Sequence, residues 1–248
     1  MKYDVGYKFT SKEGFEYEVI EVLKDSLRII RTTKSPIFTT TTRTPFIRDG
    51  IVRNPYSRNV FGRGYIGEGM YNSKNAKING KDFYDTWSKM FDRCYRGVDL
   101  TYSNVDVCEE WYNFQNFMDY VEKTFPIGIL DEKFVLDKDL LQKDSNFKIY
   151  SKDTCVWIPK RINSYIQNKR SGTNNKHKGI NKDYNQWVAS STLFEKGGIK
   201  FTIGYFYNLE EAINAYKEFK LSQDSKARQY VRDLNYLPEE IIQLIRTV

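Results

Sequence analysis

Hydrophobic and polar residues alternate along the first fifty residues of the chain. In 15–19, Phe, Tyr and Val alternate with Glu, and 27–31 continues in the same manner. A period of two predicts strands that bury one face. The threonine-rich run 39–44 adds a further β-prone segment. We therefore predict a small, curled antiparallel sheet of four or five strands within residues 1–53, for which an SH3-like barrel is one compatible form.

This alternation ends in a segment rich in Gly and Asn, residues 54–81. Its glycines disfavour a regular helix or strand, so we predict a linker or an ordered loop. A G-x-G-x-x-G string occurs at Gly62, Gly64 and Gly67, but it precedes no predicted helix. It therefore lacks the context of a phosphate-binding loop.

Apolar residues then recur every three or four positions, which predicts two helices with one buried side each. The first begins near Asp82, a helix-capping residue, and its stripe consists of Phe83, Trp87, Met90, Phe91 and Cys94. The second covers about 108–123 and buries Trp111, Phe114, Phe117, Met118 and Val121. We interpret both stripes as packing residues.

A strand, a loop, a strand and a helix are predicted between 134 and 170. The run 134–136 is apolar and β-prone, and a second short strand at 155–158 stops at Pro159. Proline suits the first turn of a helix, where its missing N–H has no helical partner. The helix then presents one apolar face, formed by Ile162, Tyr165 and Ile166.

The last part of the chain predicts three short strands followed by helices. The strands lie within 179–206, and Asn208 caps the helix that follows. In the tail we expect one helix and then a short helix that opens at Pro238. The apolar residues of this tail either pack back on the chain or form a dimer contact, and the sequence leaves both open.

Together these elements predict an α+β fold. Its expected parts are a small antiparallel β module, a Gly/Asn-rich linker, a helical pair with a ββα core, a three-stranded sheet backed by a helix, and a helical tail, at 1–53, 54–81, 82–170, 179–220 and 221–248.

The charge of the chain favours a polyanionic partner. Lys and Arg number 39 against 32 Asp and Glu, which gives a net charge of +7. Basic side chains gain affinity by releasing counterions from phosphates, so nucleic acid is the expected partner. The three cysteines form no C-x-x-C pair, and the chain has one histidine, His177. This pattern indicates a reducing compartment and no structural zinc. No apolar run of membrane-spanning length is present, so we expect a cytoplasmic protein without a membrane partner.

The segment 134–170 resembles the ββα-metal core of phage-type HNH endonucleases, a group that includes many homing endonucleases. Asp137 matches the Asp that ends the family's first strand, and Asn163 matches the residue one turn into its helix. Lys138 stands where the family has His, and Thr154 where it has Asn. A neutral imidazole takes a proton from water, whereas an ammonium group does not.

This resemblance implies three catalytic positions, Asp137, Lys138 and Asn163, with Lys138 contributing electrostatics in place of a base. It also implies that a divalent ion such as Mg²⁺, if the chain is catalytic, is held by Asp137, Asp139 and Asn163. The strings YDTWSKMFDRCY and VDVCEEWYNFQNF are similar to the helical pair upstream of the core in phage HNH proteins, and the opening VGYKFTSKEGFEYEVIEV is similar to a module fused to them.

Residues 179–220 resemble the three-stranded DNA-binding domain of plant ethylene-response (Apetala-type) factors. The likeness rests on W-x-A, a basic hairpin, G-x-F and E-A-x-x-A-Y. In that family the sheet lies in the major groove of double-stranded DNA. Carried over by position, the candidate DNA-binding residues are Lys182, Tyr184, Gln186, Trp187, Ser190, Thr192, Lys200 and Thr202. Trp187 is equally compatible with a core position, and these strands lack the arginines typical of the family.

Basic residues in the predicted helix of the ββα core and in the segment after it are further candidates for phosphate contacts, namely Arg161, Lys169, Arg170, Lys176 and Lys178. A solvated hinge is the alternative interpretation of this stretch.

Two hypotheses of function follow from the resemblances. In the first, the chain is a phage-encoded HNH endonuclease-like protein that binds double-stranded DNA and nicks or cleaves it with a metal ion. In the second, it is an inactive descendant that acts as a DNA-binding regulator, or as a protein-binding inhibitor of a host defence nuclease. Both place it in the cytoplasm of an infected bacterium. A homo-oligomer formed through the tail is compatible with either.

Overall fold

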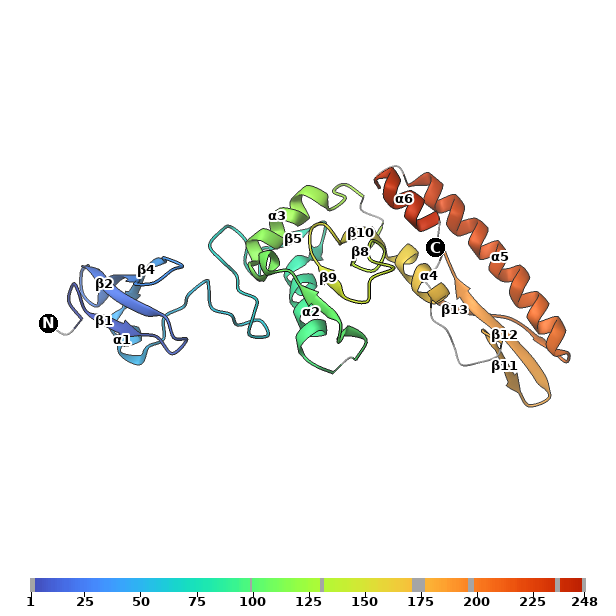
Figure 1. Ribbon diagram of the computed structural model, residues 1–248, viewed down its shortest axis with the longest axis horizontal. Coiled ribbons are helices and arrows are strands. Elements are labelled where there is room, and N and C mark those ends of the chain that lie inside the picture. Colours follow the sequence, from blue (N-terminus) through green and yellow to red (C-terminus); the bar gives the residue numbers. More distant parts are fainter. Residues whose placement is uncertain are drawn as a thin grey trace. The chain divides into compact units, whose positions relative to one another are not determined.

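The structure is a computed structural model that describes residues 3–98, 100–129, 132–170, 177–195, 199–234 and 237–246 (Figure 1). It combines helices with several antiparallel sheets, which confirms the predicted α+β class. The chain divides into two compact units. The first comprises Met1–Lys77, Asp82–Ser103 and Val107–Asp119, and the second comprises Ile78–Lys81, Asn104–Asp106 and Tyr120–Val248.

The N-terminal residues form a four-stranded antiparallel sheet in sequence order, as predicted. Its strands are β1 (Lys8–Thr10), β2 (Glu16–Val22), β3 (Leu27–Thr32) and β4 (Thr39–Arg43). A short helix that the sequence pattern did not predict, α1 (Thr44–Asp49), follows with a proline in its first turn. Gly50 ends that helix at φ +65°, a left-handed conformation that glycine adopts without strain. The core under the sheet consists of Tyr3, Tyr17, Val19, Ile30, Ile47 and Val52.

The helical pair lies where the apolar stripes predicted it. Helix α2 (Phe83–Tyr95) is capped by Asp82, whose side chain accepts a hydrogen bond from the backbone N–H of Asp85. Helix α3 (Phe114–Thr124) begins later than expected, because Glu109–Tyr112 forms a 3₁₀ turn instead. A second 3₁₀ turn covers Leu100–Tyr102. All five residues of the second stripe are buried.

The Gly/Asn-rich segment is an ordered loop that contacts side chains of the first unit. A Cβ on Gly64 would lie 2.9 Å from the ring of Trp87, so only glycine permits this approach. The amide nitrogen of Gln115 donates to the backbone oxygens of Ile66 and Tyr71, at 2.9 Å each. The glycines therefore serve close packing against α2 and α3. Short two-stranded pairs complete this region: β5 (Lys77–Ile78) with β6 (Lys81–Asp82), and β7 (Val105–Val107) with β9 (Lys148–Tyr150).

The predicted strand pair and helix are present in the second unit. Strand β8 (Phe134–Asp137) pairs antiparallel with β10 (Val156–Pro159), so that Asp137 lies opposite Val156. Helix α4 (Lys160–Arg170) follows at once and packs against both strands.

The three-stranded sheet and its helix are also present. Strands β11 (Ile180–Asp183), β12 (Gln186–Leu193) and β13 (Ile199–Phe206) form an antiparallel meander. Helix α5 (Leu209–Asp233), capped by Asn208, packs against this sheet (Figure 1). It continues without a break beyond residue 220, where the sequence placed the boundary of the module.

The tail packs back on the chain. The C-terminal half of α5, its C-cap residue Leu234 and the short helix α6 (Glu239–Arg246) contribute six residues to one core, namely Ala227, Val231, Leu234, Ile241, Ile242 and Ile245. The same core contains Ile158, Ile162 and Ile166 of the ββα unit. Of the two alternatives that the sequence leaves open for the tail, the structure shows packing back on the chain; a homo-oligomer through the tail stays a prediction. Among the described residues, no helix is both long and apolar enough to cross a membrane.

Candidate functional site

The acidic cluster at the end of β8 is fixed by its own backbone. Asp137 is 7% exposed, and its Oδ1 accepts hydrogen bonds from the backbone N–H groups of Asp139, at 3.0 Å, and Leu140, at 2.7 Å. Leu140 is buried in the core shared with α4 and α6. The carboxylate of Asp137 thus closes a turn that anchors Leu140, which is a structural role for a residue that the resemblance assigns to catalysis.

Asp139 is paired with two ammonium groups. Lys138 Nζ lies 2.9 Å from each of its carboxylate oxygens, and Lys148 Nζ lies 2.5 Å from Oδ1. The side chain of Lys138 is 8% exposed, and its Nζ also lies 5.7 Å from the ring centroid of Tyr150. Lys138 therefore supplies a buried positive charge at the position where the family has an imidazole.

The loop between β8 and β10 is closed by amide and hydroxyl groups. Gln142 donates to the backbone oxygens of Lys138 and Ile149, and its own oxygen accepts from the N–H of Ile149. Thr154, at the position of the family's Asn, donates to the oxygen of Ile149 at 2.6 Å and accepts from the N–H of Ser151. These hydrogen bonds from Gln142 and Thr154 to the backbone fix the conformation of the loop.

The two carboxylates differ in electrostatics. Burial raises the pKa of Asp137, and the charge of Asp139 adds to this effect against the opposing backbone hydrogen bonds. Burial would likewise raise the pKa of Asp139, but the ammonium groups of Lys148 and Lys138 outweigh it, so that the pKa lies below its ordinary value. Asp139 is thus the carboxylate whose ionised form is stabilised.

Asn163 lies on α4, which packs against β8. Its Oδ1 is buried and has no hydrogen-bond partner among the described residues. A buried amide oxygen without a donor is costly, so this atom is the one feature of the ββα unit that favours a ligand.

The donor set as a whole does not fit a resident divalent ion. Asp137 uses Oδ1 for two backbone donors, and the two ammonium groups at Asp139 would repel a cation. Within the described part of the chain, no three His, Cys, Asp or Glu side chains gather closely enough to hold a metal. The metal ligands predicted from the resemblance are therefore not supported by the arrangement of Asp137, Asp139 and their partners.

The three-stranded sheet has one face against α5 and one face turned away from it. Trp187 pairs with Lys182 and with Phe206. Trp187 and Phe206 pack against a core cluster that includes Ala189 of β12 and Ala212 of α5. Phe201 stacks on Phe219 of α5 with ring centroids 5.5 Å apart. Because side chains alternate along a strand, the intervening residues point away from the helix. We call this side the outer face; it contains Gln186, Val188, Ser190, Thr192, Lys200, Thr202 and Tyr205, together with Asn181 and Asp183 of β11.

Several polar groups of the outer face are accessible to an external partner. Lys200 and Thr202 are exposed, Gln186 and Thr192 are half-buried, and Tyr205 is 61% exposed. None of the first four makes a side-chain hydrogen bond with another residue that the structure describes. The turn between β11 and β12 carries Tyr184, which is 94% exposed.

Several residues predicted to bind DNA lie elsewhere. Trp187 is a packing residue on the α5 side, and Lys182 shares its face, with Nζ 5.7 Å from the indole ring. Arg161 is held by an ion pair with Glu132 at 2.9 Å and lies 4.7 Å from the ring centroid of Tyr230. Core packing engages Trp187, a cation–π contact engages Lys182 and an ion pair engages Arg161, and their predicted DNA contacts stay predictions. Ser190, a further candidate, is buried, and its hydroxyl lies 3.5 Å from the backbone oxygen of Gly179.

The remaining basic candidates give less information. Lys178 is half-buried beside β11. Lys176 and the side chains of Lys169 and Arg170 lie outside the described residues. Sequence reasoning missed Lys148, Gln142 and Tyr205. Alternation along β13 was a signal for Tyr205, whereas Lys148 reaches Asp139 only through the fold of the loop.

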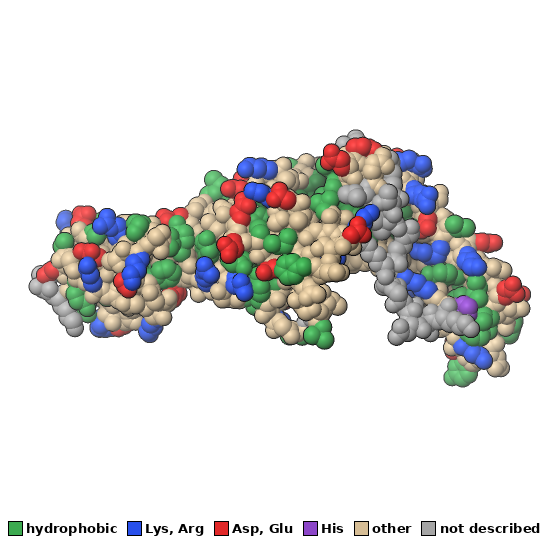
Figure 2. Space-filling model, viewed as in Figure 1, with side chains coloured by type: hydrophobic (Ala, Val, Ile, Leu, Met, Phe, Trp, Pro, Cys, Tyr) green, Lys and Arg blue, Asp and Glu red, His purple; other side chains and the backbone are tan. Residues whose placement is uncertain are grey.

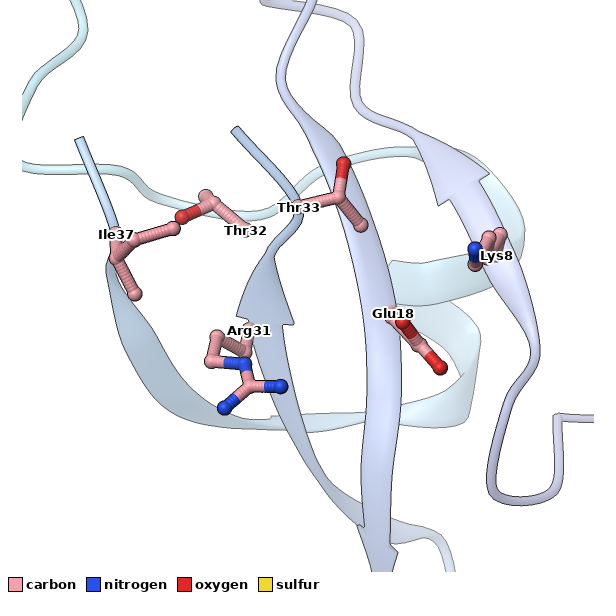
Figure 3. A pocket seen from close by; sticks show the side chains of 6 residues that line it. All are labelled: Lys8, Glu18, Arg31, Thr32, Thr33 and Ile37. Atoms are coloured by element: carbon pink, nitrogen blue, oxygen red, sulfur yellow. The ribbon is translucent and has the colours of Figure 1, made fainter. Parts of the chain in front are cut away.

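A separate hollow of about 350 Å³ lies on the N-terminal sheet (Figure 3). Lys8, Glu18 and Arg31 are neighbours across three strands and line it together with Thr32, Thr33 and Ile37. Figure 2 shows Lys and Arg intermixed with Asp and Glu over this module. The hollow is open and mixed in charge, so it singles out no class of ligand.

Comparison with protein-family models, with curated proteins and with solved structures found no match.

Proposed function

We propose that this chain binds double-stranded DNA through the outer face of its β11–β13 sheet, and that its HNH-like ββα unit serves as a support rather than as a hydrolytic centre. The observation that carries the proposal is the contrast between a sheet face with unused hydrogen-bonding groups and an acidic loop whose charges are paired internally.

The geometry of the outer face supports a duplex as the partner. An antiparallel β-ribbon fits the major groove, where side chains from alternate positions of a strand reach base edges. Gln186 offers an amide of the kind that pairs with adenine, and the methyl groups of Thr192 and Thr202 suit thymine. Lys200, opposite Thr192, suits a phosphate or a guanine edge. The net charge of +7 favours the same partner.

The buried Oδ1 of Asn163 favours a second candidate function, metal-dependent hydrolysis of DNA. In that case the oxygen would take a ligand from the substrate complex. The paired state of Asp139 argues against this candidate as the main activity, because a cation would have to displace two ammonium groups.

The DNA-binding proposal is tested by fluorescence anisotropy with a labelled mixed-sequence duplex at several salt concentrations. Lys200→Ala should weaken binding and reduce the slope of log K against log salt by about 0.9, the value for one phosphate contact. Lys217→Ala is the matched control, since it removes the same charge from an exposed position of α5. Equal effects of the two substitutions, or no binding by the unaltered chain at low salt, would reject the proposed face.

A further inference from the structure

In the loop between β8 and β10, two lysines balance the charge of two aspartates, whereas a metal site would use a bound cation for this. Its two carboxylates, Asp137 and Asp139, lie two positions apart on one turn, and they interact electrostatically. Two lysines accompany them, so the formal charges of these four side chains sum to zero. Both ammonium groups contact Asp139, and a divalent ion at that carboxylate would supply the same two positive charges.

The lysines also connect parts of the loop, as a shared ion would. Lys138 is the neighbour of Asp139 in sequence, whereas Lys148 belongs to β9 and lies nine residues after Asp139. Both reach the same carboxylate, and Gln142 bonds to the backbone at Lys138 and at Ile149. Asp139 is therefore the point at which the two sides of the loop are tied together.

Both ammonium groups are held rather than solvated freely. Side-chain exposure is 8% for Lys138 and 25% for Lys148. Gln142 fixes the loop ends, so little chain entropy is lost when the ion pairs form. An added cation would have to displace these groups into water and overcome their repulsion, which leaves it little net gain.

We propose that Lys138 and Lys148 are built-in replacements for a divalent cation, and that removing both charges opens the carboxylate of Asp139 to Mg²⁺ or Mn²⁺. The unaltered loop is then insensitive to divalent cations. The inference concerns the ββα unit alone and does not depend on DNA binding by the sheet.

The test measures thermal unfolding in EDTA and in 10 mM MnCl₂. The unaltered chain should show the same Tm in both buffers. In the double variant Lys138→Met/Lys148→Met, which keeps the aliphatic stems, Mn²⁺ should raise Tm by about 5 °C, as expected for a ligand present well above its Kd. Electron paramagnetic resonance should show one bound Mn²⁺ in the double variant only.

Two controls make the result specific. Lys200→Met/Lys217→Met removes two positive charges elsewhere and should show no Mn²⁺ effect. Adding Asp139→Asn to the loop double variant should abolish its Mn²⁺ effect.

A rise of Tm with Mn²⁺ in the unaltered chain would overturn the proposal, and so would a double variant that folds but ignores Mn²⁺. If the methionine double variant folds in neither buffer, Lys138→Gln/Lys148→Gln, which removes the same two charges and keeps polar side-chain ends, replaces it in the test. The absence of a Mn²⁺-dependent rise in Tm in that variant would equally overturn the proposal.

Discussion

The acidic loop at 137–150 and the outer face of the β11–β13 sheet are both polar, but they use their polar groups in opposite ways. In the loop, Asp137 and Asp139 have donors from the same chain. On the sheet, Lys200 and Thr202 are exposed and make no side-chain hydrogen bond to another described residue. A polar group that is satisfied internally contributes to folding, whereas one left open at a surface is free to bind.

The difference shows why a matching motif alone is a weak guide to function. The loop carries the residues that resemble a nuclease centre, and its geometry is that of a structural network. The sheet carries fewer family-specific residues, and its geometry leaves Lys200, Thr202 and Tyr205 exposed. The position and partners of the side chains therefore decide which of the two regions is the better candidate for DNA contact.

Within the sheet module, the largest effect on stability is expected on the side that packs against α5. Trp187→Ala should lower the free energy of unfolding by about 3 kcal/mol, because it leaves a cavity between the sheet and α5. Tyr184→Ala, at a position that is 94% exposed, should change it by less than about 0.5 kcal/mol. Urea denaturation measures both, and a mild effect of Trp187→Ala would place that ring outside the core.

In the loop, substitution of Asp137 separates a structural role from a catalytic one. Asp137→Ala should cost about 2 kcal/mol, because two backbone N–H groups lose their acceptor. Asp137→Asn keeps Oδ1 as an acceptor, and burial already disfavours the charged form, so its cost should be below about 0.5 kcal/mol. Equal losses for the two variants, measured by urea denaturation, would mean that the negative charge itself is required.

On the outer face, Gln186→Ala should reduce affinity for duplexes that contain A·T pairs by about 1 kcal/mol, or roughly fivefold, through loss of one base contact. Affinity for a G·C-only duplex should change less, and stability should stay the same. Competition anisotropy with the two duplexes measures the ratio. A uniform loss on both duplexes would assign Gln186 to the DNA backbone instead.

The smallest effect expected is a pH dependence from Asp139. Its pKa in the folded chain lies below the ordinary 3.8, because the two lysines outweigh burial, so its contribution to stability is present above pH 3.8 and is lost as pH falls through the lowered value. The stability difference between the unaltered chain and Asp139→Asn should therefore shrink as the pH falls from 6 to 2.5. Urea denaturation across this range checks it, and a constant difference would contradict the ion pairing.

Local patterns predicted most of the elements. Alternation predicted the strands of the first sheet, and the stripe at Trp87 predicted α2. Pro159, expected in the first turn of a helix, is instead the last residue of β10 and directly precedes α4. These features depend on near neighbours in sequence, which periodicity captures. The unexpected helix α1 follows a threonine-rich strand and has only six residues, too few for a periodic signal.

The partners of the candidate site were harder to predict. Asp137 and Asn163 were found by resemblance, but Lys148 joins Asp139 only because the loop folds back on itself. Likewise, the pairing of Arg161 with Glu132 and Tyr230 depends on the docking of α5, which no local pattern encodes. Sequence showed which groups are present, and the fold determined which of them are already paired.

The most direct test of the account combines binding and cleavage in one experiment. The chain is incubated with supercoiled plasmid in EDTA, in Mg²⁺ and in Mn²⁺, with Asp137→Ala alongside, and samples are examined for retardation and, after protein removal, for nicks. If the chain binds DNA without cutting it, the plasmid should be retarded as strongly in EDTA as with either metal, salt should weaken this retardation, and the plasmid should stay supercoiled throughout. Nicking that requires a metal and disappears in Asp137→Ala would contradict it.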